Sequence, residues 1–176
     1  MNGTADARVT GPSWDADEAV TQLYAAQYGS LVRLATLLLR DVTAAEEVVQ
    51  ESFIAMHGSW RRLRDPDRAL AYLRQSVVNR ARSALRHRKV EQRHAPLPMP
   101  DHASAEHGAL EALEREHVIR ALHALPGRQR EVLVLRYYLD LSEAQIADTL
   151  GISPGAVKSH ASRGVATLRM NLEQAT

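Results

Sequence analysis

The stretch LSEAQIADTLGISPGAVKSHASRGVATLR, residues 141–169, decides how this chain folds. Ser142 is followed three residues later by Gln145, which is the capping-box pattern that starts a helix. Gly151 then supplies a residue that adopts the left-handed conformation without strain, so this first helix is short and ends there.

A second helix follows almost at once, because Ser153 caps the chain again and Pro154 occupies the first helical position, where a missing N–H costs nothing. Residues at helical spacing form its inward face: Val157, Ala161, Gly164 or Val165, Leu168 and Leu172. The outward face carries Gly155, Lys158, Ser159, Ser162 and Arg169, with His160 and Arg163 on the flank. Such a helix suits a DNA major groove, since it is small at its start and offers a cation and hydroxyls. The alternative is an ordinary helical hairpin with a solvated polar face.

Composition indicates a folded, all-helical protein. The chain has 176 residues, 45% of them hydrophobic but only 5% aromatic, and it contains no alternating Val/Ile/Thr runs of the kind that form sheets. The absence of cysteine excludes disulfides, thiolate zinc sites and thiol redox chemistry within the chain. The longest apolar run, around residues 37–39, is too short to cross a bilayer, so we expect a cytoplasmic protein without a membrane partner.

The net charge of +1 conceals an uneven distribution of basic and acidic residues along the chain. Residues 1–57 carry 3 basic and 8 acidic residues, and residues 58–94 carry 11 and 3. Residues 95–150 carry 5 basic and 9 acidic residues, and residues 151–176 carry 3 basic residues and 1 acidic residue. Two basic blocks therefore alternate with two acidic ones, which suggests two nucleic-acid footprints on scaffolds that meet other partners. Solvated faces of unequal sign are the alternative.

The first part of the chain predicts a small helical domain over residues 17–90, after a disordered lead over residues 1–16. A core helix from Asp17 is indicated by one apolar face: Leu23, Tyr24, Tyr28, Leu31, Leu34, Ala35 and Leu38. Thr43 with Glu46 reads as a second capping box, opening a helix to about His57. Its inward residues are Val48, Val49, Ser52, Phe53 and Met56.

The outer face of that second helix carries Glu47, Gln50 and Glu51. Glu47 and Glu51 are one turn apart, and a separate Glu114–His117 pair has the spacing found in carboxylate-bundle metal sites. Neither has the further ligands that a di-metal site needs, so we expect no metal and no cofactor. A protein-docking face is the favoured interpretation, and a solvated face is the competing one.

Residues 58–64, GSWRRLR, are predicted to form a basic loop carrying Trp60, because Gly58 ends one helix and Pro66 begins the next. The next helix, to about Lys89, is predicted to bury Leu70, Leu73, Val77, Ala81 and Leu85. A second face of it aligns Tyr72, Gln75, Asn79, Arg82 and Arg86. Rings and guanidiniums in line suit a single nucleic-acid strand, although a lone Trp is as often a core residue.

Alternating Pro96, Pro98 and Pro100 predict an extended linker over residues 91–104. A C-terminal domain over residues 105–176 should then contain four helices. The first runs from about Ser104 to Ala124, and the second follows the 125–127 Leu-Pro-Gly turn and carries Val132, Leu133, Leu135 and Tyr137. The helix-turn-helix pair completes it.

Three blocks in this order resemble the extracytoplasmic-function sigma factors of bacterial RNA polymerase, specifically the sigma-E-like group. AAEEVVQESFIAMH resembles the segment that binds the polymerase clamp, and SWRRLRDPDRALAYLRQSVVNRARSALRHR resembles the segment that melts DNA and reads the minus ten element. LPGRQREVLVLRYYLDLSEAQIADTLGISPGAVKSHASRGVATLR resembles the minus thirty-five domain. The resemblance spans nearly everything from Leu23 to Leu172 except the linker.

The resemblance implies a factor that binds core RNA polymerase and directs promoter recognition, melting and initiation, without chemistry of its own. Core polymerase would be met by Glu47, Gln50 and Glu51. The single-stranded minus ten element would be met by Trp60, Arg61 and Arg62, with Tyr72, Gln75, Asn79 and Arg82. The double-stranded minus thirty-five element would be met by Gly155, Lys158, Ser159, His160, Ser162 and Arg163. An anti-sigma factor is a further partner that the resemblance leaves open.

Some positions depart from the family pattern. Ala44 stands where an acid is common, His57 where a bulky aromatic is common, and Lys158 and His160 where Arg is common. Because Lys is a point charge where Arg is a bidentate fork, these departures bear on the promoter sequence and leave the class intact. A helix-turn-helix repressor or activator is the alternative function, and a helical metal-carboxylate enzyme is a more distant one.

Overall fold

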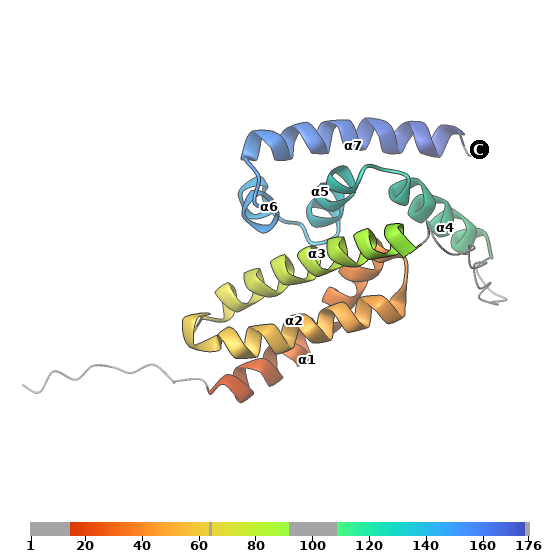
Figure 1. The fold of residues 1–176 in the computed structure, drawn as a ribbon. Coiled ribbons are helices and arrows are strands. Elements are labelled where there is room, and N and C mark those ends of the chain that lie inside the picture. The colour runs from red at the N-terminus through yellow and green to blue at the C-terminus, as the bar shows by residue number, and fades with distance from the viewer. Residues whose placement is uncertain (1–14, 64, 92–108, 175–176) are drawn as a thin grey trace, which may run out of the picture.

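The computed structural model describes residues 15–63, 65–91 and 109–174, with side chains in the last range from residue 114 onward. Seven helices occupy these ranges, and the same ranges contain no strand, which confirms the predicted all-α class (Figure 1). The helices are α1 (Ala16–Leu39), α2 (Val42–Leu63), α3 (Pro66–Glu91), α4 (Ala109–His123), α5 (Gly127–Tyr137), α6 (Glu143–Leu150) and α7 (Pro154–Gln174). The predicted lead and linker lie outside the described residues except for Asp15, Ala16 and Glu91.

Helices α1, α2 and α3 pack together as one layer of the fold (Figure 1). Apolar residues three and four positions apart on each helix point to a common core, where Leu34, Met56 and Leu73 have almost no exposed surface. Burial of each such side chain contributes about 1.5–3 kcal/mol. The predicted stripe on α3 is shifted, because Ala69 and Val78 are buried whereas Leu70 and Leu85 are only half-buried.

The start of α2 differs from the prediction, and the Thr43–Glu46 capping box is wrong. The helix begins at Val42, and the Asp41 carboxylate accepts a hydrogen bond from the backbone N–H of Ala44 at 3.0 Å. This bond, together with the Arg88 guanidinium, lowers the pKa of Asp41. Asp41 is as good a cap as threonine and sits one residue before the helix, where the orphan N–H groups can reach it.

The predicted basic loop over residues 58–64 is also wrong, because α2 continues through Gly58 to Leu63. Phe53, Met56 and Trp60 prolong the buried face at helical spacing, and Trp60 is only 6% exposed. Glycine within a helix costs about 1 kcal/mol, which burial of a tryptophan easily offsets. Gly58 therefore does not end a helix, and only Gly151 has a left-handed backbone among the described glycines.

The C-terminal half confirms the predicted four-helix arrangement with its helix-turn-helix. Ser142 and Gln145 form both bonds of the capping box, and Gly151 ends α6 with φ of 64°. The Ser153 hydroxyl accepts from the N–H of Ala156 at 3.1 Å, and α7 begins at Pro154. Local signals were decisive here because every one of these bonds forms within a few residues.

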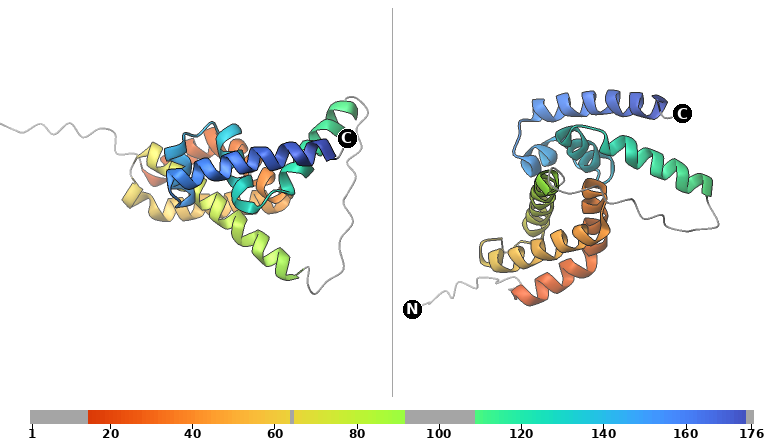
Figure 2. Two further views of the ribbon diagram at one scale, coloured as in Figure 1. Left: turned by 90° about the horizontal axis from the view of Figure 1, so that it is seen from above. Right: turned by 45° about the vertical axis from the view of Figure 1, so that its right-hand side comes forward.

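The two halves pack against each other. Helices α5 and α6 lie between α7 and the first three helices, with α5 against α1 and α6 against α3 (Figures 1 and 2). The Tyr138 hydroxyl accepts from Arg33 Nε at 3.1 Å and donates to the Ser30 carbonyl at 3.3 Å. Arg40, at the end of α1, pairs with Glu116 on α4. The described residues thus form one closed body.

Candidate nucleic-acid interface

The start of α7 presents the surface predicted for DNA. Gly155 is exposed, as are the side chains of Lys158, Ser162 and Arg163, and the side chains of Ser159 and His160 are partly exposed. Val157, Ala161 and Gly164 are buried on the opposite side, as predicted. The structure therefore brings the six minus thirty-five candidates together on the open side of the helix-turn-helix, while their contacts with DNA stay a prediction.

Helix α7 is held close to α5 through Gly164. A Cβ atom at this position would lie 3.1 Å from Leu133 Cγ and 3.3 Å from Gln129 Cβ, closer than side chains normally approach. The two helices can approach this far because glycine leaves that space open. This contact fixes how far α7 stands out from the domain, and hence how deeply its exposed face can enter a groove.

A carboxylate behind the recognition surface was missed by the sequence analysis. Glu143, the first residue of α6, lies 3.2 Å from the Arg136 guanidinium and 3.7 Å from the Lys158 ammonium. Lys158 remains 70% exposed, so this is a loose pair that leaves the ammonium free to meet DNA. The pairing could not be predicted because Arg136, Glu143 and Lys158 come from three different helices.

The face of α3 predicted for a single strand is only partly open. Gln75, Asn79 and Arg86 are exposed and Tyr72 is half-buried. Arg82 points into the contact with α5, where Nε and Nη2 each lie 2.9 Å from a carboxylate oxygen of Glu131. Its Nη1 also donates to the Asn79 side chain at 3.3 Å.

The three residues predicted to melt DNA separate into two kinds. Arg61 and Arg62 are exposed in the last turn of α2, and Arg62 donates to the Ser59 hydroxyl at 3.3 Å. Trp60 is buried, so its ring packs in the core and does not offer a stacking surface in this structure. The core interpretation of this tryptophan is therefore the one that its burial supports.

The predicted docking face lies on α2. Glu47, Gln50 and Glu51 are all exposed, and Ile54, one turn beyond, is 73% exposed at the same side of the helix. An isoleucine this open, ringed by polar residues, is typical of a protein contact. The sequence analysis named Ile54 on neither face of this helix, because it took the outer face from polar residues alone.

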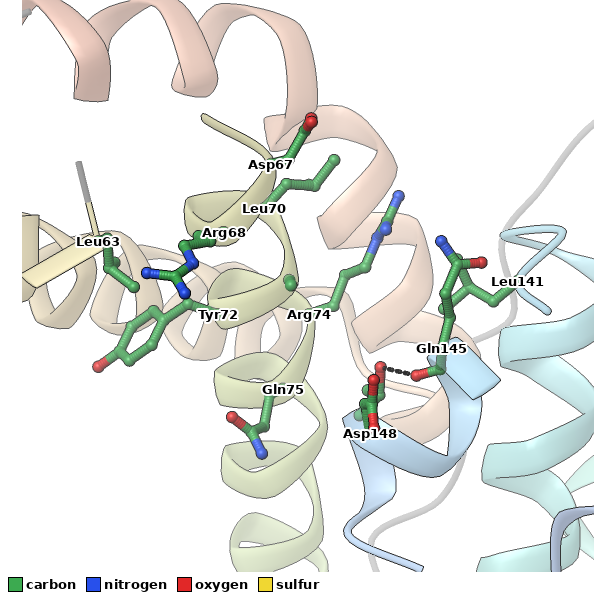
Figure 3. Close-up of a pocket in the computed structure, with 12 residues that line it drawn as sticks. Leu63, Asp67, Arg68, Leu70, Tyr72, Arg74, Gln75, Leu141, Gln145 and Asp148 are labelled. Atoms are coloured by element: carbon green, nitrogen blue, oxygen red, sulfur yellow. Dashed lines mark hydrogen bonds between the residues drawn. The ribbon is translucent and has the colours of Figure 1, made fainter. Parts of the chain in front are cut away.

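A cavity of about 670 Å³ opens between α3 and α6 (Figure 3). Tyr72, Arg74 and Gln75 line it from α3, and Gln145 and Asp148 line it from α6. Arg74 points toward α6, whereas Tyr72 and Gln75 point to the other side of α3 (Figure 3). Burial lowers the pKa of Arg74 from its ordinary value. The cavity is a boundary between the two halves and brings two minus ten candidates beside the helix-turn-helix.

Within ranges 15–63, 65–91 and 109–174, no group of three or more His, Asp or Glu side chains could hold a metal ion. His117, half of the Glu114–His117 pair, instead lies 3.2 Å from the Leu172 carbonyl on α7. None of the described helices is long and apolar enough to cross a membrane.

Comparison with known proteins gives two family matches. Residues 23–90 match the family described as Sigma-70 region 2, and residues 115–168 match Sigma-70, region 4. The chain is 33% identical to the RNA polymerase sigma-E factor of Streptomyces avermitilis, over 82% of this chain and 79% of that protein. It is 34% identical to the ECF RNA polymerase sigma factor SigL of Mycobacterium tuberculosis (strain H37Rv), over 96% of this chain and 97% of that protein.

Two solved structures share the fold. One is CnrH in complex with the cytosolic domain of CnrY. Its TM-score is 0.67 and its sequence identity 25%, and the match covers 92% of this chain and 96% of that chain. The other is the sigma factor RpoE in complex with the anti-sigma factor NepR from Bartonella quintana, with a TM-score of 0.69, 22% identity and coverage of 87% and 96%. The region 4 match covers the helix-turn-helix, and the region 2 match covers most of α1 and all of α2. The chain belongs to the extracytoplasmic-function sigma factors, which direct RNA polymerase to promoters.

Proposed function

We propose that this sigma factor uses three helices, α2, α3 and α7, to bind core RNA polymerase and the two promoter elements. The exposed face of α2, with Glu47, Gln50 and Glu51, binds core RNA polymerase. Arg61 and Arg62, with the α3 face of Tyr72, Gln75, Asn79 and Arg82, contact the single-stranded minus ten element. The start of α7, with Gly155, Lys158, Ser159, His160, Ser162 and Arg163, reads the double-stranded minus thirty-five element. Trp60 supports the melting segment from the core.

The observation that carries this division is the exposure of an acidic face on α2 and a basic face on α7 in one chain. A cationic helix start suits phosphates and base edges, whereas an acidic helix face repels DNA and suits a protein partner. A repressor or activator would need only the helix-turn-helix. The region 2 match over residues 23–90 favours the sigma factor.

The same proposal assigns no catalytic group, metal or cofactor to the chain, since the polymerase supplies the chemistry. Its place of action is the bacterial cytoplasm, where core polymerase meets DNA. A likeness to RpoE, which was solved with an anti-sigma factor, supports an anti-sigma partner as part of the proposal.

Run-off transcription with purified core RNA polymerase tests the division. The parent chain should give a discrete transcript from a promoter selected from a genomic fragment library. Glu47→Lys should lose the transcript together with polymerase binding, whereas Lys158→Ala should keep polymerase binding and change promoter use. No transcript with the parent, or loss of polymerase binding with Lys158→Ala, would contradict the assignment.

A further inference from the structure

We propose that Glu131 acts as an internal substitute for a DNA phosphate, holding the chain closed by occupying Arg82. The C-terminal half and a single strand then compete for the same guanidinium. This inference rests on the proposed role of the α3 face and adds its regulation. In the free chain, the α3 face binds α5 of the same chain.

The geometry at Glu131 is that of a strong ion pair. Its two carboxylate oxygens accept from Arg82 Nε and Nη2 at 2.9 Å, and Arg128 Nη1 lies 3.1 Å from the second oxygen. Glu131 is only 7% exposed, so the pair is largely shielded from water. Arginine offers the same planar pair of N–H donors to carboxylate and to phosphate, and one guanidinium fork cannot serve both at once.

Helix α6 adds a negative charge near this face of α3. Tyr72 and Gln75, two other members of the predicted minus ten face, line the same open cavity as Asp148 on α6. The acidic Asp148 also stands where phosphates would pass, and like charges repel.

A second set of contacts, which does not involve Arg82, also holds the two halves together. Tyr138 bonds to Arg33 and to the Ser30 carbonyl on α1, and Arg40 at the end of α1 pairs with Glu116 on α4. These contacts touch none of the proposed DNA-binding residues. They therefore allow the closed form to be weakened without altering the DNA surface.

Promoter geometry requires the chain to open. Minus ten and minus thirty-five elements lie about 25 base pairs apart, which is about 85 Å at 3.4 Å per base pair. In this structure α6 packs against both α3 and α7, so α3 and α7 are separated there by about two helix diameters, roughly 20–24 Å. The closed chain cannot reach both elements at once. Residues 92–108 join the halves, and a chain of that length can span at most about 60 Å.

A closed population lowers apparent DNA affinity by the fraction of chains that are open. If one chain in ten is open, full opening should strengthen binding about tenfold. The contact with Arg82 is to a phosphate, so a plain oligothymidine of about twelve nucleotides is a suitable probe.

The test measures anisotropy of a labelled oligothymidine with the full chain. Glu131→Gln should bind about tenfold more tightly than the parent. Glu114→Gln is the matched control, because it removes the same charge from an exposed residue of the C-terminal half. Tyr138→Phe is the second variant, since it removes the contacts to Arg33 and Ser30 while keeping the ring, and it should also strengthen binding.

Opening can be followed separately because the chain has no cysteine. Fluorescent labels on cysteines placed at the exposed His87 and Glu173 should show lower energy transfer in Glu131→Gln than in the labelled parent. Equal oligothymidine affinity for Glu131→Gln and Glu114→Gln would overturn the proposal. If Glu131→Gln fails to fold, equal affinity for Tyr138→Phe and the parent would overturn it. Failure of the parent in run-off transcription would instead count against the proposed function.

Discussion

Arg80 on α3 pairs with Glu51 on α2, with Nη1 2.6 Å from Oε2. This ion pair joins the proposed polymerase face to the helix that carries the proposed minus ten face. Both partners are substantially exposed, so the pair contributes at most about 1 kcal/mol to stability. Reversing the charge of Glu51 would also place a cation beside Arg80, so its effect on polymerase binding would be mixed with a local repulsion.

Ile54 gives a cleaner test of the docking face. Ile54→Ala should weaken core polymerase binding by about 1–2 kcal/mol, because an apolar residue at the centre of a polar face contributes most when the partner covers it. The melting temperature should not change, since the side chain is 73% exposed in the free chain. Binding can be measured by titrating labelled chain with core enzyme.

Val42→Ala is the control for that measurement. Val42 is 57% exposed on the same helix but lies on another side of it. Equal losses of affinity for Ile54→Ala and Val42→Ala would mean that the docking face is not where we place it.

Trp60 should behave as a core residue. Trp60→Ala should lower the free energy of unfolding by about 3–5 kcal/mol, because it leaves a large cavity under α2. Arg61→Ala should leave stability unchanged and reduce promoter opening, since Arg61 is exposed at the end of the same helix. Denaturant unfolding and permanganate footprinting of the opened DNA would measure the two effects. A stable Trp60→Ala chain that fails only in opening would restore the stacking role.

The sequence predicted best what depends on neighbours in the chain. The helix-turn-helix followed from Ser142, Gln145, Gly151 and Ser153, whose bonds all close within a few residues. Gly58 is a local stop signal, but the helix continues past it because burial of Trp60 in the packed core outweighs that signal. Tertiary packing routinely overrides a local propensity of about 1 kcal/mol.

The contact between the halves could not be predicted at all. Arg82 and Glu131 are 49 positions apart, and nothing in the spacing of either helix indicates that they meet. Periodicity correctly placed Arg82 off the core stripe of α3. It could not distinguish a side chain that faces water from one that faces a second domain, because both look polar in the pattern.

The free energy of unfolding should fall as the pH is lowered from the ordinary pKa of histidine, 6.5, to the pKa of His123 in the folded chain, about 4. Burial, and then the charge of Arg130, lower the pKa of His123 to about 4 from 6.5, with Arg40 adding to this and Glu116 opposing it. The unfolded chain therefore binds a proton at a pH where the folded chain does not. Stability is complete above about pH 6.5 and is lost progressively down to about pH 4, by up to about 3 kcal/mol.

His123→Met should remove this part of the pH dependence. Urea unfolding at pH 7 and at pH 5 would compare the two chains, and the parent should lose more stability than the variant between these values. Parallel stability curves for parent and variant would contradict the prediction.

Lys158 and Arg163 should do different work at the minus thirty-five element. Both are exposed, and Lys158 lies nearer the start of α7, which we propose enters the groove first. Lys158→Ala should change the rank order of minus thirty-five variants, with a loss of roughly 1–3 kcal/mol at one position. Arg163→Ala should lower the use of all variants and reduce the salt slope by about one, as expected for a phosphate contact.

Glu143 makes the distinction sharper, because its carboxylate lies 3.7 Å from the Lys158 ammonium and is itself held by Arg136. We expect this carboxylate to restrain Lys158 near the base edges. Glu143→Gln should therefore raise affinity for all sequences, through loss of a negative charge near DNA, and should narrow the differences between them. A promoter-variant library transcribed with each chain measures both effects. If Lys158→Ala keeps the parent's rank order while Arg163→Ala reshuffles it, then Arg163 reads the bases and α7 enters the groove in the other orientation.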